Sequence, residues 1–186
     1  MSTRDGFIQG YNAQTSTSAD QFITHARLTQ DTNDVAQFWP TITSVQSTLA
    51  ILTERVPERA DDLHIGTALA DSGYNSPDNL TAHGPDRLIA NHMPPTLTDQ
   101  PPPEHATPRQ KMDHRLATEQ GRALYQQRAP QVEAPNAWLK DGRGLRKGFS
   151  RRGLKAAQSE LCFAAAVTNL LHLFNLGITT PQLATT

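Results

Sequence analysis

The sequence has 186 residues but only one cysteine, few aromatic side chains and no long apolar run. A single cysteine, Cys162, cannot form an intramolecular disulfide, and its place in an apolar helical pattern predicts a buried, inert thiol. The apolar stretch 161–176 is too short for a membrane span and is interrupted by polar residues. The first ten residues lack the charged and apolar regions of a secretory signal. We expect a cytoplasmic protein that does not contact membranes.

Motifs of several common site types are also absent. Neither the phosphate loop G-x-x-x-x-G-K-S/T nor the dinucleotide pattern G-x-G-x-x-G occurs in the sequence. The seven histidines are scattered, and no pair has the spacing of zinc ligands. The net charge is only −1, so the chain as a whole carries no nucleic-acid signature. Nucleotide binding through those loops and a zinc site are therefore not supported.

Positive charge is instead concentrated in one glycine-punctuated segment. Between residues 140 and 155 the sequence has seven cationic side chains and a single acidic one. Such a local cluster is typical of a surface that binds phosphate groups, although each cation taken singly is more often a solvated surface charge. The candidate DNA-binding cations of this segment are Lys140, Arg143, Arg146, Lys147, Arg151 and Arg152.

The order of hydrophobic patterns predicts an α/β fold with helices on a mixed sheet. Two β-rich segments joined by a polar turn predict an antiparallel hairpin, and apolar steps of three and four residues from Val35 predict a long helix. Pro130 is expected to stop one helix, and Pro135 requires the next helix to begin near Glu133. The expected strands are 7–17, 22–29, 63–70 and 87–91, and the expected helices start at 35 and 77, span 111–129, start near 133 and span 151–176.

We expect one domain that consists of three parts. Residues 1–92 supply the hairpin, helix and strand part of a catalytic domain. Residues 93–110 are rich in proline and are expected to form an extended, mobile insertion. Residues 111–186 form a C-terminal helical part that contains Glu133 and the cationic segment.

The first candidate site residue is Asp71. It follows the predicted buried strand 63–70, at the end of a strand where open α/β sheets place ligands and functional residues. The alternative is a turn residue whose side chain bonds its own backbone ahead of Gly73.

The second candidate is Glu133, which lies between the cations Arg128 and Lys140. Glu133 and Lys140 are seven residues apart, so on a helix both side chains point the same way, about 10 Å apart along the axis. Cations on both sides of a carboxylate suit an anionic, metal-bound substrate. Alternatively, Glu133 stabilises the positive end of a helix. Phosphoryl transfer on nucleic acid commonly uses two divalent ions bridged by carboxylates, and oxygen ligands suit Mg²⁺ or Mn²⁺.

At these residues the sequence resembles the bacterial insertion-sequence transposases of the DDE type, whose catalytic domain has a ribonuclease-H-like fold. Residues 10–14 (GYNAQ) resemble a strand of that family, and 70–74 (ADSGY) resemble the turn that holds its second catalytic aspartate. The helix with the catalytic glutamate is similar to residues 132–140. Tyr125, Arg128, Glu133 and Lys140 resemble the family signature in the same order. Residues 143–146 and 152–154 resemble the segments that usually follow this signature, and residues 169–171 resemble the closing helix of the family.

The resemblance implies that Asp71 and Glu133 are catalytic ligands of Mg²⁺ or Mn²⁺, and that Tyr125, Arg128 and Lys140 contact DNA near the cut. It also implies an incomplete ribonuclease-H-like sheet with an unpaired edge, because the family's first catalytic aspartate lies on a strand upstream of GYNAQ. This chain starts too late to contain that strand. Asp5 and Asp20 are the nearby acids, and neither stands where the ligand is expected.

Three hypotheses follow from these patterns. The first is a C-terminal portion of a DDE transposase, truncated and inactive alone, related to enzymes of metal-dependent DNA cleavage and strand transfer. The second is a non-catalytic DNA-binding or interaction module that uses the cationic segment and pairs with itself or with an intact transposase. The third is a decayed gene product that folds poorly. The expected partner in the first two is DNA, and in the first it is the transposon ends.

Overall fold

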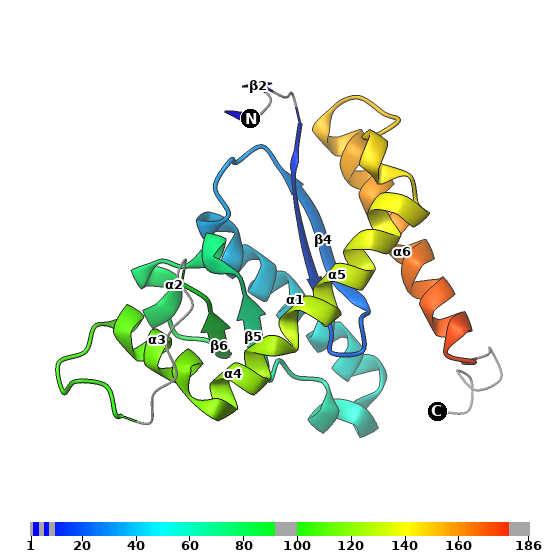
Figure 1. Cartoon of the computed structure of the whole chain (residues 1–186). Coiled ribbons are helices and arrows are strands. Elements are labelled where there is room, and N and C mark those ends of the chain that lie inside the picture. Colours follow the sequence, from blue (N-terminus) through cyan, green and yellow to red (C-terminus); the bar gives the residue numbers. More distant parts are fainter. Residues whose placement is uncertain (1, 4–5, 8–9, 92–99, 179–186) are drawn as a thin grey trace. The chain divides into compact units, whose positions relative to one another are not determined.

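The structure is a computed structural model that describes residues 2–3, 6–7, 10–91 and 100–178 (Figure 1). The chain divides into two compact units. Unit 1 contains residues 1–32 and 130–186, and unit 2 contains residues 33–129. These boundaries differ in position from the sequence-based division at residues 92 and 110, which stays a prediction. Each unit is described by itself.

Unit 1 is built on an antiparallel hairpin of β3 (Asn12–Thr17) and β4 (Ile23–Thr29), which confirms the predicted hairpin. The turn between the strands is closed by Ser18, whose hydroxyl accepts a hydrogen bond from the Phe22 amide at 3.1 Å. Threonine and isoleucine in these strands favour the extended backbone. A shorter antiparallel pair, β1 (Ser2–Thr3) and β2 (Gly6–Phe7), precedes the hairpin.

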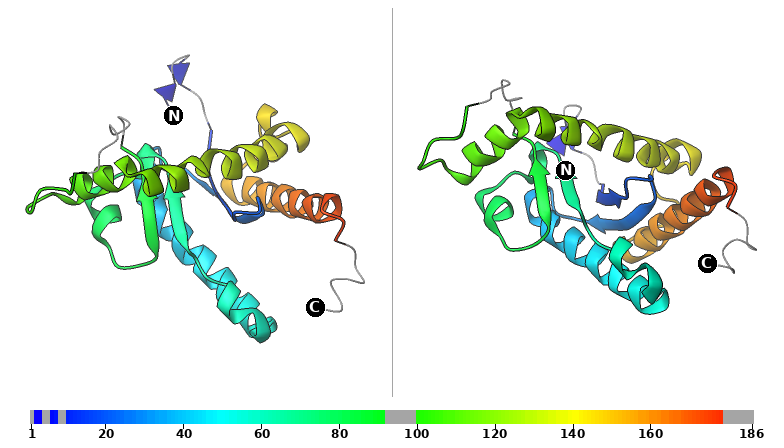
Figure 2. Two further views of the ribbon diagram at one scale, coloured as in Figure 1. Left: turned by 60° about the horizontal axis from the view of Figure 1, so that its bottom comes forward. Right: turned by 90° about the horizontal axis from the view of Figure 1, so that it is seen from below.

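Helix α6 (Leu154–Asn175) lies alongside this hairpin, as both views of Figure 2 show. The helix begins after Gly153, whose φ of +89° is a conformation that residues with a Cβ rarely adopt. It is slightly shorter than the predicted helix 151–176. The buried side chains that form the core of unit 1 are Ile23, Leu28, Leu139, Ala157, Leu161, Ala164 and Ala165.

Amide side chains of α6 also occupy the outer edge of β4. Gln158 accepts a hydrogen bond from the Leu28 amide at 2.6 Å and donates one to the Ala26 carbonyl at 3.0 Å. Asn169 accepts from the Ile23 amide and donates to the Ile23 carbonyl, both at 2.9 Å. An open strand edge is a template for further strand pairing, and these bonds block that pairing on β4.

Helix α5 (Arg128–Ala137) contains two prolines and differs from the sequence-based expectation. Pro130 does not end a helix, because it lies in the first turn, where the missing N–H would have no partner in the helix. The fully buried Pro135 lies inside the helix rather than in a first turn. The expectation that a helix begins near Glu133 is therefore wrong, and Glu133 lies in mid-helix. The chain continues into the π-helix η4 (Trp138–Gly142) and the 3₁₀-helix η5 (Leu145–Lys147).

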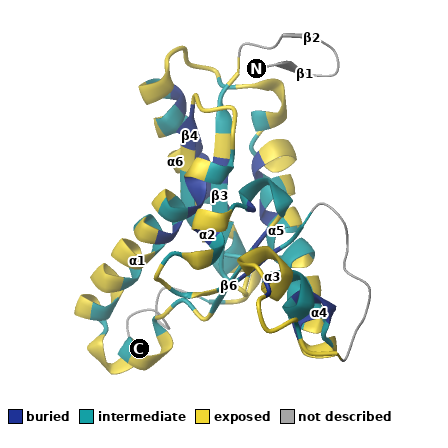
Figure 3. Ribbon diagram, turned by 90° about the vertical axis from the view of Figure 1, so that its left-hand side faces the viewer, coloured by how far each residue is buried: buried dark blue, intermediate teal, exposed yellow. Residues whose placement is uncertain are grey.

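Unit 2 starts with the 3₁₀-helix η1 (Val35–Gln37) and helix α1 (Phe38–Arg55). Just before this start, the Asn33 side chain accepts a hydrogen bond from the Val35 amide at 2.9 Å. The buried residues of α1 are Phe38 and Ile42, and the rest of the helix is largely exposed or half-buried (Figure 3). A 3₁₀-helix, η2 (Pro57–Asp62), follows α1.

A parallel pair of strands, β5 (Thr67–Ala70) and β6 (Asp86–Ile89), forms the centre of unit 2. The 3₁₀-helix η3 (Ser72–Tyr74) and helix α2 (Pro77–Thr81) connect them. The predicted strand 63–70 is confirmed only over its last four residues. The buried core of unit 2 consists of Phe38, Ile42, Ala70 and Ile89.

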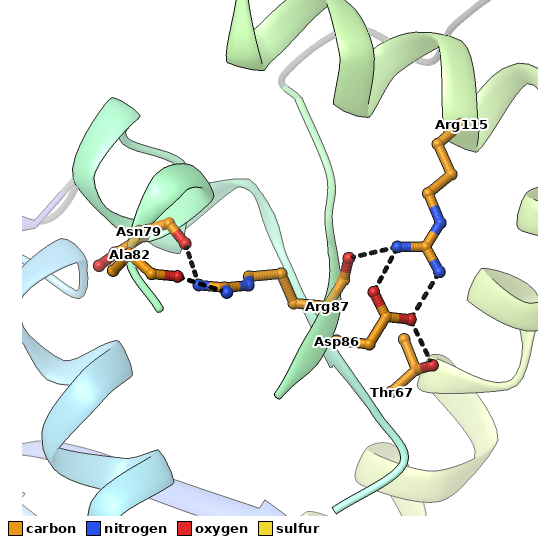
Figure 4. A network of polar contacts seen from close by, with 6 residues as sticks. All are labelled: Thr67, Asn79, Ala82, Asp86, Arg87 and Arg115. Atoms are coloured by element: carbon orange, nitrogen blue, oxygen red, sulfur yellow. Dashed lines mark hydrogen bonds and ion pairs between the residues drawn. The ribbon is translucent and has the colours of Figure 1, made fainter. Parts of the chain in front are cut away.

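Two arginines fix the edge of this strand pair (Figure 4). Arg115 binds both carboxylate oxygens of Asp86, at 2.5 and 2.6 Å, and the Thr67 hydroxyl donates to the same carboxylate at 2.8 Å. The hydrogen bonds from Arg115 lower the pKa of Asp86 to about 2. Arg87 reaches the other way, donates to the Asn79 carbonyl at 2.9 Å, and lies over the Trp39 ring at 4.7 Å. These contacts join the strands to the helices around them.

The predicted helix 111–129 is in fact two helices, α3 (Pro108–Ala117) and α4 (Glu119–Gln126). Thr118 separates them and caps α4 by accepting a hydrogen bond from the Gly121 amide at 3.1 Å. Gly121 lies so close to the end of α3 that an added Cβ would be 1.9 Å from the Arg115 carbonyl oxygen. Residues 92–99 of the predicted insertion lie outside the described residues, and the described residues 100–107 contain neither helix nor strand.

Among the described residues, each of the three sheets has two strands, of which one pair is parallel and two are antiparallel. This is the predicted α/β class, consistent with part of a ribonuclease-H-like domain. Cys162 is exposed, so the expectation of a buried thiol is wrong. It lies beside the edge of β4, where Gln158 donates to its Sγ at 3.0 Å and the Ala26 carbonyl oxygen is 3.8 Å from that sulfur. Within the described ranges, none of the helices has the length and apolar character that crossing a membrane requires.

Candidate DNA and metal site

Asp71 stands at the carboxyl end of β5, as predicted. Its carboxylate caps η3 by accepting a hydrogen bond from the Gly73 amide through Oδ1 at 2.9 Å. The alternative interpretation, a turn residue that bonds its own backbone, is thus also correct. The two roles are compatible, because the residue is exposed and its second carboxylate oxygen is not the one that makes this cap.

Tyr125 ties helix α4 to the backbone next to Asp71. Its hydroxyl donates a hydrogen bond to the Ala70 carbonyl at 3.1 Å. Arg128 lies over the Tyr125 ring at 5.7 Å from its centre. Burial raises the pKa of Tyr125, and the charge of Asp71 adds to this rise while Arg128 opposes it. The structure therefore brings Asp71, Tyr125 and Arg128 together within unit 2.

The Nε of Arg128 is buried and has no hydrogen-bond partner among the described residues. A guanidinium has five N–H donors in a planar fork that matches phosphate oxygens. A buried donor without a partner costs free energy, which an anionic ligand would recover. This geometry suits Arg128 to contact a phosphate beside Asp71.

Asp34 is a neighbour of Asp71 that the sequence did not suggest. A Cβ added to Gly73 would lie 3.0 Å from Asp71 Oδ1 and 3.2 Å from Asp34 Oδ2, so both carboxylates flank this glycine. Burial together with both negative charges raises the pKa of Tyr74 to about 12. In the sequence Asp34 shows only a helix-capping signal, and no local pattern relates it to the distant Asp71.

Glu133 and Lys140 belong to unit 1, and both are exposed. Glu133 lies in α5, whereas Lys140 lies in the π-helix η4. A π-helix turns the chain less per residue than an α-helix does, so the shared face expected from seven α-helical residues is not kept in full. The sequence could not show this, because the expectation assumed a regular helix through both residues.

The predicted cations of unit 1 differ in their contacts. Arg143 donates to the Thr168 hydroxyl of α6 at 3.4 Å, and Arg146 forms a two-bond ion pair with Asp141. That pair lowers the pKa of Asp141. The other predicted cations, Lys140, Lys147, Arg151 and Arg152, are exposed. The segment therefore presents both anchored and exposed positive charge on one unit.

Glu160 of α6 fixes the loop that presents Arg151 and Arg152. Its carboxylate accepts hydrogen bonds from the Ser150 amide at 3.0 Å, the Ser150 hydroxyl at 2.9 Å and the Arg151 amide at 3.3 Å. These bonds, with the Ser150 amide as the main donor, lower the pKa of Glu160. Sequence analysis missed this residue, since its partners lie about ten residues away in a loop without a regular period.

Asp71 and Glu133 have the hard oxygen donors that Mg²⁺ and Mn²⁺ prefer. They lie on different units, and the part of the chain that the structure describes contains no group of three histidine, cysteine or acidic side chains able to hold a metal ion. The donor types fit a divalent ion, and the described residues supply an incomplete set of ligands.

Residues 98–174 match the family model described as the transposase DDE domain. This part of the chain is similar to the DDE domain of transposases. The matched residues include Tyr125, Arg128, Glu133, Lys140 and the cationic segment, so the resemblance to a DDE-type transposase is confirmed over this part of the chain. Asp71 lies outside the matched residues, and its assignment depends on the 70–74 motif and on the contacts described above. Comparisons with curated proteins and with solved structures gave no significant match.

Proposed function

We propose that this chain binds DNA and contributes Asp71 and Glu133 as two ligands of a divalent metal site for DNA cleavage and strand transfer. Bound Mg²⁺ or Mn²⁺ would activate the attacking oxygen and stabilise the leaving oxygen. The single observation that carries the proposal is the transposase DDE domain match, which contains Glu133 and its flanking cations.

The contacts around Asp71 support its part in the proposal. The Gly73 amide holds one oxygen of its carboxylate, and the Tyr125 hydroxyl holds the carbonyl of the preceding residue. A metal ligand must be positioned by its surroundings before the metal arrives, and these bonds provide that positioning. Arg128, with its buried Nε, would neutralise a DNA phosphate next to the metal.

The cations of unit 1 would track the DNA backbone, at transposon ends in particular. Lys140, Arg143, Arg146, Lys147, Arg151 and Arg152 are the residues proposed for this contact. Their charges are sequence-independent phosphate ligands, so binding should weaken steeply as salt is added.

We further propose that the chain alone binds DNA without cutting it. A two-metal site commonly needs carboxylates that bridge both ions, and Asp71 and Glu133 are two residues on separate units. The described strands form pairs rather than one sheet, and the β3 edge opposite β4 could accept a further strand that carries a third carboxylate.

The ligand role of Asp71 can be tested without measuring activity. Mn²⁺ titrated into the ¹⁵N-labelled chain should broaden the amide signals of Asp71 and Gly73 first, because the ion is paramagnetic and would bind next to them. Asp71→Asn should remove this broadening, and Asp61→Asn, an exposed acid in η2, should leave it unchanged. Equal broadening in the Asp71→Asn variant would contradict the assignment.

The claim that the chain alone does not cut DNA has its own assay. Purified chain incubated with plasmid DNA and Mn²⁺ should leave the plasmid supercoiled. Cleavage that disappears in Asp71→Asn would show that the 186 residues already contain a complete site.

A second function is favoured by one observation. The cationic segment lies wholly in unit 1, where α6 holds its loop through Glu160 and its Arg143 through Thr168. This arrangement does not need a metal, so the chain could act as a non-catalytic DNA-binding module. Unchanged DNA affinity in the presence of EDTA, and in Asp71→Asn, would favour this function over the first.

A further inference from the structure

Helix α6 has a second apolar face that no other described part of unit 1 covers. Phe163, Leu170 and Phe174 are 72%, 65% and 72% exposed. Together with the half-buried Val167 they follow steps of four, three and four residues, which place them in one row along the helix. We call these four residues the α6 stripe.

The stripe lies on a different face of α6 from the one that packs on the hairpin. Leu161, Ala164 and Thr168 are buried at 2%, 6% and 3% exposure, and the helical period puts them roughly 120° around the helix from the stripe. The exposed apolar residues therefore do not belong to the core of unit 1. Soluble proteins rarely leave such a continuous apolar row in water unless it binds another surface.

The spacing and charge of the stripe indicate what kind of surface it binds. Alternating steps of three and four apolar residues are the pattern of the seam between two paired helices. Residues 161–186 contain no aspartate, glutamate, lysine or arginine. An uncharged row of side chains has no electrostatic attraction to a DNA phosphate or to a charged peptide. Two identical uncharged rows can pack against each other without charge repulsion.

We propose that the α6 stripe is a self-association surface on which a second copy of this chain packs its own stripe. A two-fold dimer uses the same patch on both partners, and a neutral helix face satisfies that requirement. From the exposed fractions, each stripe with its flanking leucines offers roughly 600 Å² of apolar surface, taking the usual size of aromatic side chains. The pair would bury about 1,200 Å², the lower end for specific interfaces, which predicts a reversible dimer.

This inference goes beyond DNA binding and does not depend on it. The stripe contains no cation, and the cationic segment ends before Phe163. Loss of self-association and loss of DNA binding are therefore separate results, obtained with different variants.

Sedimentation equilibrium of the full chain tests the proposal. From about 1 to about 100 µM, a range that spans the dissociation of weak interfaces, the mass should rise from 20.4 kDa toward twice that value. The variants Phe163→Glu and Phe174→Glu should each keep the mass of a monomer over the whole concentration range. Ile51→Glu is the matched control, because Ile51 is also an apolar residue on a helix surface, 53% exposed, and lies outside the stripe.

The outcomes are distinct. A wild-type chain that stays single over the whole range overturns the proposal, and so does self-association that survives both charged variants or is lost equally in Ile51→Glu. If a charged variant fails to fold, the double variant Leu170→Ala/Phe174→Ala shortens the stripe without adding charge. It should weaken self-association at least tenfold, and an unchanged dissociation constant in that variant would also overturn the proposal.

Discussion

At the scale of single residues, Tyr125 is the side chain that connects the transposase signature to Asp71. We predict that Tyr125→Phe lowers the free energy of unfolding by about 1 kcal/mol, because it removes the hydrogen bond to the Ala70 carbonyl and leaves that group without its partner. Urea denaturation measures the change. The matched control is Tyr11→Phe. Tyr11 contacts Phe149 through its ring, which the substitution keeps, so the free energy of unfolding should change little. Equal effects in both variants would contradict the role given to Tyr125.

Asp86 gives a prediction that depends on pH. Hydrogen bonds from Arg115 hold its pKa at about 2 in the folded chain, below the ordinary value of 3.8. A lowered folded pKa adds stability that is present above the ordinary value and is lost as the pH falls toward 2. Asp86→Asn should therefore cost about 1 kcal/mol at pH 7, a value reduced because water screens this partly exposed pair, and almost nothing at pH 2.

The control for this prediction is Asp62→Asn, which breaks the more exposed pair with Arg59. Its effect on urea denaturation at pH 7 should be near zero. A cost for Asp86→Asn that stays the same at both pH values would show that the lost stability is not due to the carboxylate charge.

The sequence predicted single residues well where one local rule decided their position. Asp71 follows strand β5, of which only the last residue, Ala70, is buried, and the strand end placed it correctly. Asp34 and Glu160 were missed because each contacts residues that come close only in the folded chain. Asp34 lies beside Gly73, far from it in the sequence, and Glu160 accepts hydrogen bonds from a loop that has no regular period. No pattern within a window of the sequence carries those contacts.

At the scale of elements, the junction between α3 and α4 depends on Gly121. We predict that Gly121→Ala lowers the free energy of unfolding by about 3 kcal/mol, because its Cβ would collide with the backbone oxygen of Arg115 and force the helices apart. Thermal or urea denaturation measures the loss. Gly142→Ala is the matched control, since a Cβ there meets nothing within 4 Å. A Gly121→Ala variant as stable as Gly142→Ala would contradict the close approach.

The same junction explains why the sequence suggested one helix where there are two. Residues 111–129 are strong helix formers, and nothing in their composition requires a break. The break comes from Thr118, whose hydroxyl caps a new helix, and from the close approach that only glycine allows. The error at Glu133 has the opposite cause, because Pro130 and Pro135 were read as boundaries and the structure accommodates both in α5.

At the scale of the whole molecule, unit 1 joins segments that are far apart in the sequence. Residues 12–29 pack against 154–175, and Gln158 bonds Leu28 across 130 positions. The α/β class and the order of most elements followed from local periodicity. The grouping of the first and last segments did not, because such pairing depends on side chains that meet only after folding.

The central proposal is that this chain binds DNA phosphates through its cationic segment. The most direct test is fluorescence anisotropy with a labelled DNA duplex, repeated over a series of salt concentrations. Arg151→Ala/Arg152→Ala should reduce the steepness of the logarithmic salt dependence by about 1.8, the value for two lost phosphate contacts. The control Arg55→Ala/Lys111→Ala, which removes two exposed cations of unit 2, should leave the slope unchanged. An unchanged slope in the first variant, or no DNA binding by the wild-type chain, would contradict the claim.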